Sequence, residues 1–193
     1  DGSFMVLHME NGLINHVHTG STEYDGAKMT EKVRATSEKE NMSLGKSFTF
    51  NIKPTPNSFM QLGKREQTGE DWKEQWKRAT KNTFNRTGIE GVWGRQMSDP
   101  DTIMVKFILD HTWAWVVINK KTGLIIRSLG GTFEYNAPEY IEKSEFHFNS
   151  PNSIGGTLQS ELTVQGEELS LVGTINRDGE KNQLKETWKR FEW

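Results

Sequence analysis

Histidines near the start of the chain offer metal-binding chemistry. His16 and His18 are separated by one residue, and on a strand this spacing points both imidazoles to one face, which suits Zn²⁺ or Cu²⁺. His8 is the third histidine nearby. Asn11-Gly12 lies between two apolar runs and predicts a two-residue hairpin turn in which Leu7 faces His16. This register puts His8 on the opposite face, so a third ligand is missing. We therefore expect no metal site here, only polar surface or neutral interior histidines.

The sequence gives little support for acid–base or nucleophilic catalysis. Glu134-Tyr135 and Glu23-Tyr24 each place a carboxylate beside a phenol, a pair that can act as acid and base. Neighbouring strand residues point to opposite faces, however, so the two groups cannot converge on one substrate atom. No segment has the pattern of a turn that carries a catalytic serine, and Gly130-Gly131 and Gly155-Gly156 are typical of bends or bulges. We expect no catalytic residues, no cofactor and no enzymatic activity.

The elements that must position these residues occur twice. Residues 185–190 (KETWKR) repeat residues 73–78 (KEQWKR) with one difference. Shorter matches keep the same order at similar spacing: Gly12-Leu13-Ile14 with Gly123-Leu124-Ile125, Glu23-Tyr24 with Glu134-Tyr135, and Glu31-Lys32 with Glu142-Lys143. Ordered matches of this kind indicate an internal duplication. We predict a first repeat at residues 1–80, a linker at residues 81–88 and a second repeat at residues 89–193.

Alternating and apolar stretches bounded by turn residues predict an all-β chain. The second repeat has nine such stretches, at residues 89–95, 103–109, 113–118, 124–128, 131–135, 140–148, 157–164, 169–175 and 183–191. Residues 71–78 also fit helical spacing, with acids first and bases last. In the matching residues 185–190 the side chains alternate as in a strand, so we predict that residues 71–78 also form a closing strand. The simplest arrangement is two tandem up-and-down antiparallel barrels.

Composition sets further limits. The 193 residues include seven Trp and ten Phe, which supply enough aromatic surface for packed cores and exclude a disordered chain. A formal net charge of −2 without a basic stripe disfavours a nucleic-acid partner. The absence of cysteine excludes disulfides, and the longest apolar stretch, residues 113–118, is far too short to cross a bilayer. The chain begins Asp1-Gly2-Ser3 without an initiator Met or a signal sequence, which we interpret as a processed fragment.

The second repeat resembles a known group of barrels. Gly91-x-Trp93 in its first strand and Arg190 in its last resemble the motifs of lipocalin-like (calycin) domains. In that family the tryptophan packs under the barrel floor and the arginine lies across it, a contact that contributes about 0.5–2 kcal/mol. The longer run from EGVW through WAWV, KTG and GGTFEY to ETWKR is similar to small secreted bacterial lipocalin-like domains of unknown function. The resemblance covers residues 89–193 well and residues 1–78 more loosely.

The resemblance also implies a compartment and a way of closing the barrels. It implies a secreted, periplasmic or cell-surface protein. The first repeat has no Gly-x-Trp strand, so we expect its opening strands to lie upstream of Asp1. In each closing strand a tryptophan stands between a glutamate and an arginine on one strand face, and we expect it to be sandwiched by that ion pair at the barrel end. These closure residues, besides Trp93 and Arg190, are Trp76, Arg78 and Trp188.

Aromatic residues of the second repeat are the candidate ligand contacts: Trp113, Trp115, Phe133, Phe146 and Phe148. A barrel of eight to ten strands either holds one small ligand or fills itself with side chains, and aromatic interiors favour flat or lipidic guests. We expect a non-enzymatic protein that binds a small apolar or amphipathic molecule in the second repeat, because the open seam of the first admits water. The alternative is an interaction module with filled barrels whose outer faces dock a partner protein or a glycan.

Overall fold

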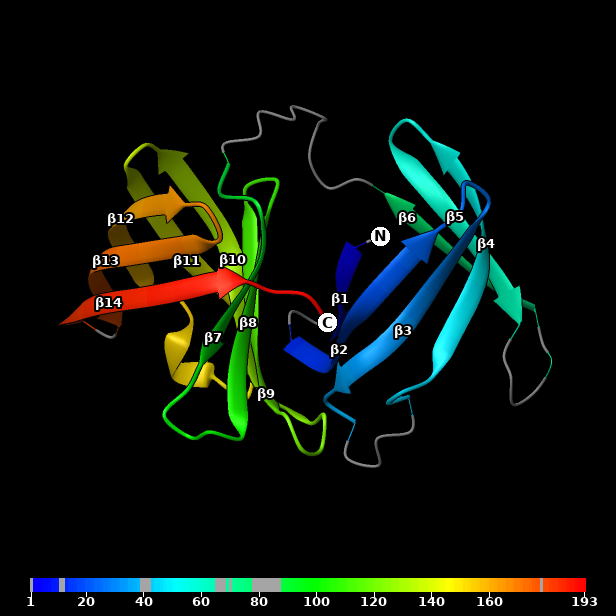
Figure 1. Ribbon diagram of the computed structural model, residues 1–193, viewed down its shortest axis with the longest axis horizontal. Coiled ribbons are helices and arrows are strands. Elements are labelled where there is room, and N and C mark those ends of the chain that lie inside the picture. Colours follow the sequence, from blue (N-terminus) through cyan, green and yellow to red (C-terminus); the bar gives the residue numbers. More distant parts are fainter. Residues whose placement is uncertain are drawn as a thin grey trace.

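The computed structural model describes residues 2–10, 13–38, 43–64, 69, 71–77, 88–177 and 179–193. Figure 1 shows two β units beside each other, an open curled sheet and a closed barrel. Within these residues, no helix combines the length and the apolarity needed to span a bilayer. The prediction of an all-β fold is confirmed.

The open sheet contains six strands in sequence order, each antiparallel to the next. They are β1 (Gly2–Glu10), β2 (Leu13–Tyr24), β3 (Lys28–Thr36), β4 (Ser47–Thr55), β5 (Ser58–Lys64) and β6 (Asp71–Lys77). The prediction of a strand rather than a helix at β6 is confirmed, and its exposed polar residues alternate with half-buried Trp72, Glu74 and Trp76.

The barrel contains eight strands and one short 3₁₀ helix. They are β7 (Gly91–Gln96), β8 (Thr102–Leu109), β9 (Thr112–Asn119), β10 (Ile125–Asn136), β11 (Glu139–Phe148), η1 (Pro151–Ser153), β12 (Thr157–Gln165), β13 (Glu168–Arg177) and β14 (Glu180–Arg190). Each strand pairs antiparallel with its neighbour in sequence, and β14 returns to β7 to close the ring. This up-and-down meander is compatible with a lipocalin-like fold.

One strand of the barrel covers two of the stretches that the sequence analysis predicts as separate strands. Residues 124–128 and 131–135 belong to the single long strand β10. Gly130 pairs with Phe146 and Gly131 with Ser144, so Glu145 is left over as a bulge. The bulge therefore lies on β11, while both glycines stay paired and β10 continues through them. The barrel accordingly has eight strands instead of nine.

The six strands of the sheet correspond in order to β9 through β14 of the barrel. Within the described residues, each unit carries two bulges, and those of the sheet recur in the barrel 111 positions later. Asn15 is the extra residue opposite β1, as Ile126 is opposite β9. Arg34 is the extra residue opposite β2, as Glu145 is opposite β10. Irregularities that recur at one spacing support the internal duplication, and the described part of the first unit contains no counterpart of β7 and β8.

The limits of the repeats stay a prediction. Residues 78–87, which hold Arg78 and most of the expected linker at residues 81–88, lie outside the described residues.

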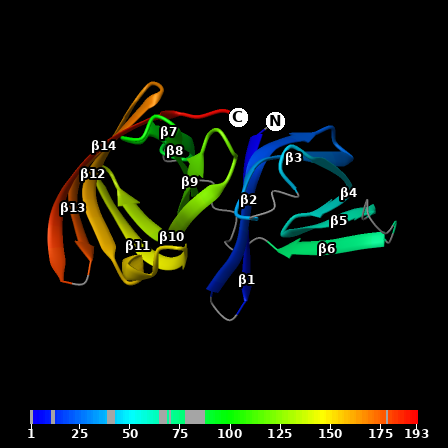
Figure 2. The same cartoon turned by 90° about the horizontal axis from the view of Figure 1, so that it is seen from below.

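Two apolar clusters of described residues stabilise the molecule. One fills the barrel around Trp93, Tyr140 and Trp188. The other lies between the units, where Val17 and Ala35 from the outer face of the sheet meet Val116 and further residues on the outside of the barrel. In Figure 2, β1 and β2 lie next to the barrel, on the side of the sheet that carries this cluster.

Candidate functional site

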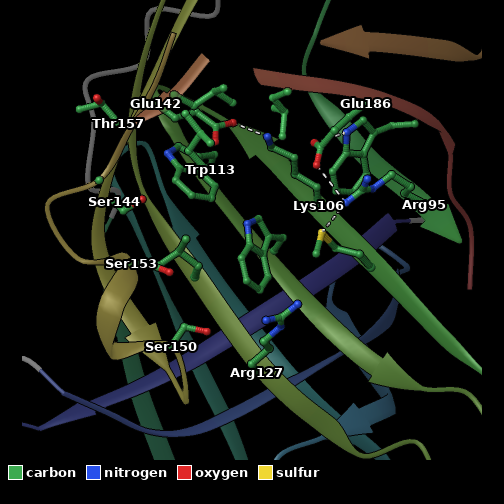
Figure 3. Close-up of a pocket in the computed structure, with 18 of the residues that line it drawn as sticks. Arg95, Lys106, Trp113, Arg127, Glu142, Ser144, Ser150, Ser153, Thr157 and Glu186 are labelled. Atoms are coloured by element: carbon green, nitrogen blue, oxygen red, sulfur yellow. Dashed lines mark hydrogen bonds and ion pairs between the residues drawn. The ribbon is translucent and has the colours of Figure 1, made fainter. Parts of the chain in front are cut away.

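A cavity of about 210 Å³ opens inside the barrel. Inward-facing residues of β7 to β14 line it, together with residues of the segment that carries η1. The lining is mixed, with Trp113, Trp115 and Leu129 among the apolar residues. The polar residues shown in Figure 3 are Arg95, Lys106, Arg127, Glu142, Ser144, Ser150, Ser153, Thr157 and Glu186.

A buried ion pair lies at one end of this cavity. The Lys106 ammonium donates to Glu142 Oε1, and both side chains are nearly fully buried. The ammonium also faces three aromatic rings, at 5.3 Å from the ring centroid of Trp113, 5.6 Å from Tyr140 and 5.5 Å from Trp188. Ring faces stabilise a cation, so Lys106 is held by one carboxylate and an aromatic cage.

The same environment affects Tyr140. Burial, and then the nearby Glu142 carboxylate, raise the pKa of the Tyr140 phenol well above its usual value of 10. The phenol therefore stays protonated at neutral pH and presents no additional charge to the cavity.

A second ion pair occupies the neighbouring wall. Arg95 Nη2 lies 2.9 Å from Glu186 Oε1, and Glu186 Oε2 accepts from Trp188 Nε1 at 3.1 Å. The guanidinium lies 5.1 Å from the Trp188 ring centroid. Trp188 was expected between Glu186 and Arg190. Arg95 takes the place beside Trp188 that was expected for Arg190, because Arg190 lies on Trp93 in the barrel floor instead.

Arg127 stands apart from these pairs. Its guanidinium lies 5.8 Å from the Trp115 ring centroid on an exposed part of β10. Within the described part of the chain, no carboxylate lies within ion-pair distance of it. Figure 3 shows Arg127 with Ser150 and Ser153 toward the opposite end of the view from Glu142. Among the described residues, Lys106 and Arg95 in the cavity wall thus have a carboxylate partner and Arg127 has none.

The five predicted ligand contacts are not brought together. Trp113 and Trp115 line the cavity. Phe133 packs in the barrel core against Tyr140, with ring centroids 5.4 Å apart. Phe146 and Phe148 join the cluster between the units instead. The bulge at Glu145 causes this, because one extra residue turns every later side chain of the strand to the other face.

The barrel floor is closed by an arginine and a tryptophan. Arg190 lies 3.8 Å from the ring centroid of buried Trp93, and its Nη1 donates to Glu90 O at 2.7 Å. Gly91 has a φ of +141°, and a Cβ added there would lie 1.9 Å from Arg190 Nη1. The glycine of the Gly-x-Trp motif therefore makes room for the guanidinium.

Arg190→Ala is expected to destabilise the barrel by about 1–3 kcal/mol, because it removes the stacked guanidinium and uncovers the Trp93 indole. Urea unfolding followed by tryptophan fluorescence measures the change. Arg127→Ala is the matched control, because its contact with Trp115 is longer and Trp115 is only half-buried, whereas Trp93 is fully buried. It should change stability by less than about 0.5 kcal/mol. A urea midpoint equal to that of the wild type would show that Arg190 does not stabilise the floor.

The closing strand of the sheet is built differently. Trp76 Nε1 donates to Gln61 Oε1, and its ring stacks on Phe59 with centroids 6.0 Å apart. Trp76 and Trp188 occupy corresponding strands, and in both the indole N–H binds a side-chain oxygen.

Three histidines meet on the inner face of the sheet, contrary to expectation. The ligand nitrogens of His8, His16 and His18 all lie within 4.8 Å of one another. The turn register was predicted correctly as far as Met9 and Ile14, which pair. The bulge at Asn15 then shifts the register, so His8 rather than Leu7 pairs with His16. One extra residue therefore moves the histidine pair onto the face of His8.

Hydrogen bonds orient this cluster. His16 Nε2 lies 3.1 Å from His18 Nδ1, and His16 Nδ1 lies 3.3 Å from Ser37 Oγ. Glu38 Oε1 lies 3.9 Å from His16 Nε2, and Glu38 Oε2 accepts from the backbone N–H and the hydroxyl of Ser43. The carboxylate is thus fixed beside the imidazoles.

Burial favours the neutral form of His16 and His18. It is the main cause that lowers the pKa of His18 from 6.5 to about 4, with His16 and then His8 adding to the effect. Burial also lowers the pKa of His16, although Glu38 opposes the shift. Neutral imidazole is the form that ligates metals.

The histidines open onto a second cavity, of about 340 Å³. Phe48, Phe50 and Trp72 form much of its apolar wall, and the Phe50 and Trp72 ring centroids lie 4.8 Å apart. This cavity occupies the inner face of the sheet, the position that the lumen takes in the barrel.

No family model matches the chain, and no curated protein or solved structure is significantly similar to it. The two cavities are therefore characterised by their own geometry.

Proposed function

We propose that the protein is a non-enzymatic binding protein whose barrel holds a small amphipathic molecule. The observation that carries this proposal is the uneven lining of the barrel cavity. Trp113, Trp115 and Leu129 supply an apolar wall, whereas Arg127 brings a cation without a carboxylate partner among the described residues. A guest with an apolar body and one anionic group matches both parts.

The size of the cavity narrows the guest further. Pockets for drug-sized ligands measure roughly 300–1,000 Å³, and this cavity has about 210 Å³. A compact ring system with one acidic group fits that volume better than a long acyl chain.

The charges inside the cavity support binding rather than catalysis. Lys106 is engaged by Glu142, and Arg95 by Glu186. Each carboxylate therefore already has a cationic partner, whereas a general base must be able to accept a proton from the substrate.

The compartment belongs to the same proposal. The Gly91-x-Trp93 motif and Arg190 resemble secreted lipocalin-like domains, and the Arg190–Trp93 contact in the barrel floor supports that resemblance. We therefore propose that the protein acts outside the cytoplasm, with a small molecule as its ligand.

Native mass spectrometry of freshly purified protein tests for a co-purified small molecule. Calorimetric titration with naphthalene-2-sulfonate and with the uncharged 2-naphthalenemethanol then tests the chemistry of the site. The sulfonate is expected to bind more tightly, and Arg127→Leu should remove that preference while leaving the alcohol unaffected. Equal binding of both probes by the wild type would contradict an anion-selective cavity.

The double substitution Trp113→Ala with Trp115→Ala is expected to weaken binding of the sulfonate at least tenfold, about 1.4 kcal/mol, because it removes the aromatic wall. Titration calorimetry of the full chain measures this change. Trp72→Ala is the matched control, since Trp72 lines the other cavity, and it should leave the affinity unchanged. Loss of binding in Trp72→Ala alone would place the site in the sheet.

A further inference from the structure

We propose that His8, His16 and His18 form a binding site for a divalent transition-metal ion such as Zn²⁺. The site lies on the inner face of the open sheet, in a different unit from the barrel cavity, and does not depend on the proposed function.

The spacing of the nitrogens fits a metal ion. Two ligands of a tetrahedral zinc ion lie about 3.3 Å apart, given Zn–N bonds of about 2.0–2.1 Å. His16 Nε2 and His18 Nδ1 already lie 3.1 Å apart. One ring nitrogen of each of the three histidines, His8 included, lies within 4.8 Å of the other two. Because His8 is exposed on its strand, a small side-chain rotation is enough to complete the triad.

Backbone structure holds the ligands in place. His8 and His16 are direct partners across the β1–β2 ladder, and His18 follows His16 on the same face. Ligands on paired strands keep their separation better than ligands on loops. The bulge at Asn15, which brings the three together, is therefore part of the site.

Neighbouring side chains complete the environment. Metal-bound histidines usually place their second ring nitrogen against a hydrogen-bond partner, and His16 Nδ1 faces Ser37 Oγ. The Glu38 carboxylate, fixed by Ser43, stands beside His16 Nε2, where it can accept a hydrogen bond from a metal-bound water. Three imidazoles leave the fourth position of a tetrahedral ion open, and it faces the cavity lined by Phe48, Phe50 and Trp72.

The barrel shows that the fold does not need these histidines. At the corresponding places, after the equivalent bulge at Ile126, the barrel carries Val117 paired with Arg127, followed by Leu129. The bulged strand pair of the barrel therefore forms without histidines, with Val117, Arg127 and Leu129 at these three places. Three imidazoles in the sheet are thus a local addition, and metal ligation explains why all three converge.

Calorimetric titration of the chelator-treated full chain with ZnCl₂ tests the proposal. We expect one Zn²⁺ per chain with a dissociation constant in the micromolar range or tighter. His8→Val, His16→Arg and His18→Leu, which copy the residues of the barrel, should each weaken binding at least 100-fold. Glu38→Gln should weaken it by roughly tenfold, as expected for a residue that acts through a bound water.

Two controls keep the result interpretable. His111→Asn changes an exposed histidine of the barrel at a φ of +64°, which asparagine tolerates, and should bind Zn²⁺ like the wild type. Thermal unfolding without metal shows whether each variant is folded, and exposed His8 is the position least needed for packing. Titration with CoCl₂ should give the visible absorption of tetrahedral Co²⁺ in the wild type and lose it in His8→Val. Absence of Zn²⁺ binding by the wild type, or undiminished binding in folded His8→Val, would overturn the proposal.

Discussion

Glu142→Gln is expected to lower the free energy of unfolding by about 3–5 kcal/mol, because it leaves the buried Lys106 ammonium without its carboxylate. Glutamine keeps the shape of the side chain, so packing is preserved. The rings of Trp113, Tyr140 and Trp188 compensate only in part. With a urea dependence of about 1–3 kcal/mol/M, the midpoint should fall by at least about 1 M.

The double variant Lys106→Met with Glu142→Leu separates charge from packing. Replacing both members of a buried ion pair by apolar residues is often neutral, so most of the lost stability should return. If the double variant is as unstable as Glu142→Gln, the loss comes from disturbed packing rather than from an unpaired charge.

Gly131→Ala is expected to cost about 2–3 kcal/mol, because the new Cβ would lie 2.0 Å from the backbone oxygen of Lys143. Backbone on the facing strand cannot rotate away as a side chain can, so the bulge between β10 and β11 must open. Chemical unfolding monitored by circular dichroism measures the loss.

The duplicated geometry supplies a matched pair for this experiment. Gly20 holds the equivalent position in the sheet, 1.9 Å from the oxygen of Lys32, and Gly20→Ala should cost a similar amount. Gly2→Ala is the control, since its Cβ would meet only Thr22 Cγ2 at 3.7 Å and should change stability by less than about 0.5 kcal/mol. If Gly131→Ala proves as stable as Gly2→Ala, the bulge is loosely packed and the prediction is wrong.

Most of the fold could be predicted from the periodicity of the sequence and from its internal repeat. Alternation and turn residues predicted the strands, and the second copy of KETWKR resolved β6, whose own pattern also fits a helix. These signals are local, or compare the chain with itself, so they need no knowledge of which strand lies opposite.

The direction of side chains was harder to predict, because it depends on the partner strand. A bulge is set by the hydrogen bonds between two strands, and its position follows from neither strand alone. This single cause misplaced His8 relative to His16 and sent Phe146 and Phe148 out of the cavity. With one extra residue inserted at Asn15, the same turn prediction would have placed His8, His16 and His18 on one face.

The buried ion pair did leave a signal in the sequence. Lys106 is the only charged residue in the apolar run at residues 103–109, and such a lysine needs a partner. Its partner Glu142 belongs to the repeated Glu-Lys pair, but thirty-six positions separate the two residues. Only the closed barrel brings β8 and β11 across from each other.

The apolar layer between sheet and barrel affects how the chain can be divided. The two units are separable along the sequence, but apolar residues of the sheet cover an apolar surface of the barrel. The sheet contributes Ile14, Val17 and Ala35, and the barrel contributes Val105, Val116, Ile118 and Ile125. Excision of either unit would expose this layer to water, and exposed apolar patches of this kind promote aggregation. The smallest piece of the chain that keeps both surfaces covered is therefore the pair, so truncation is a poorer route to either site than point substitution.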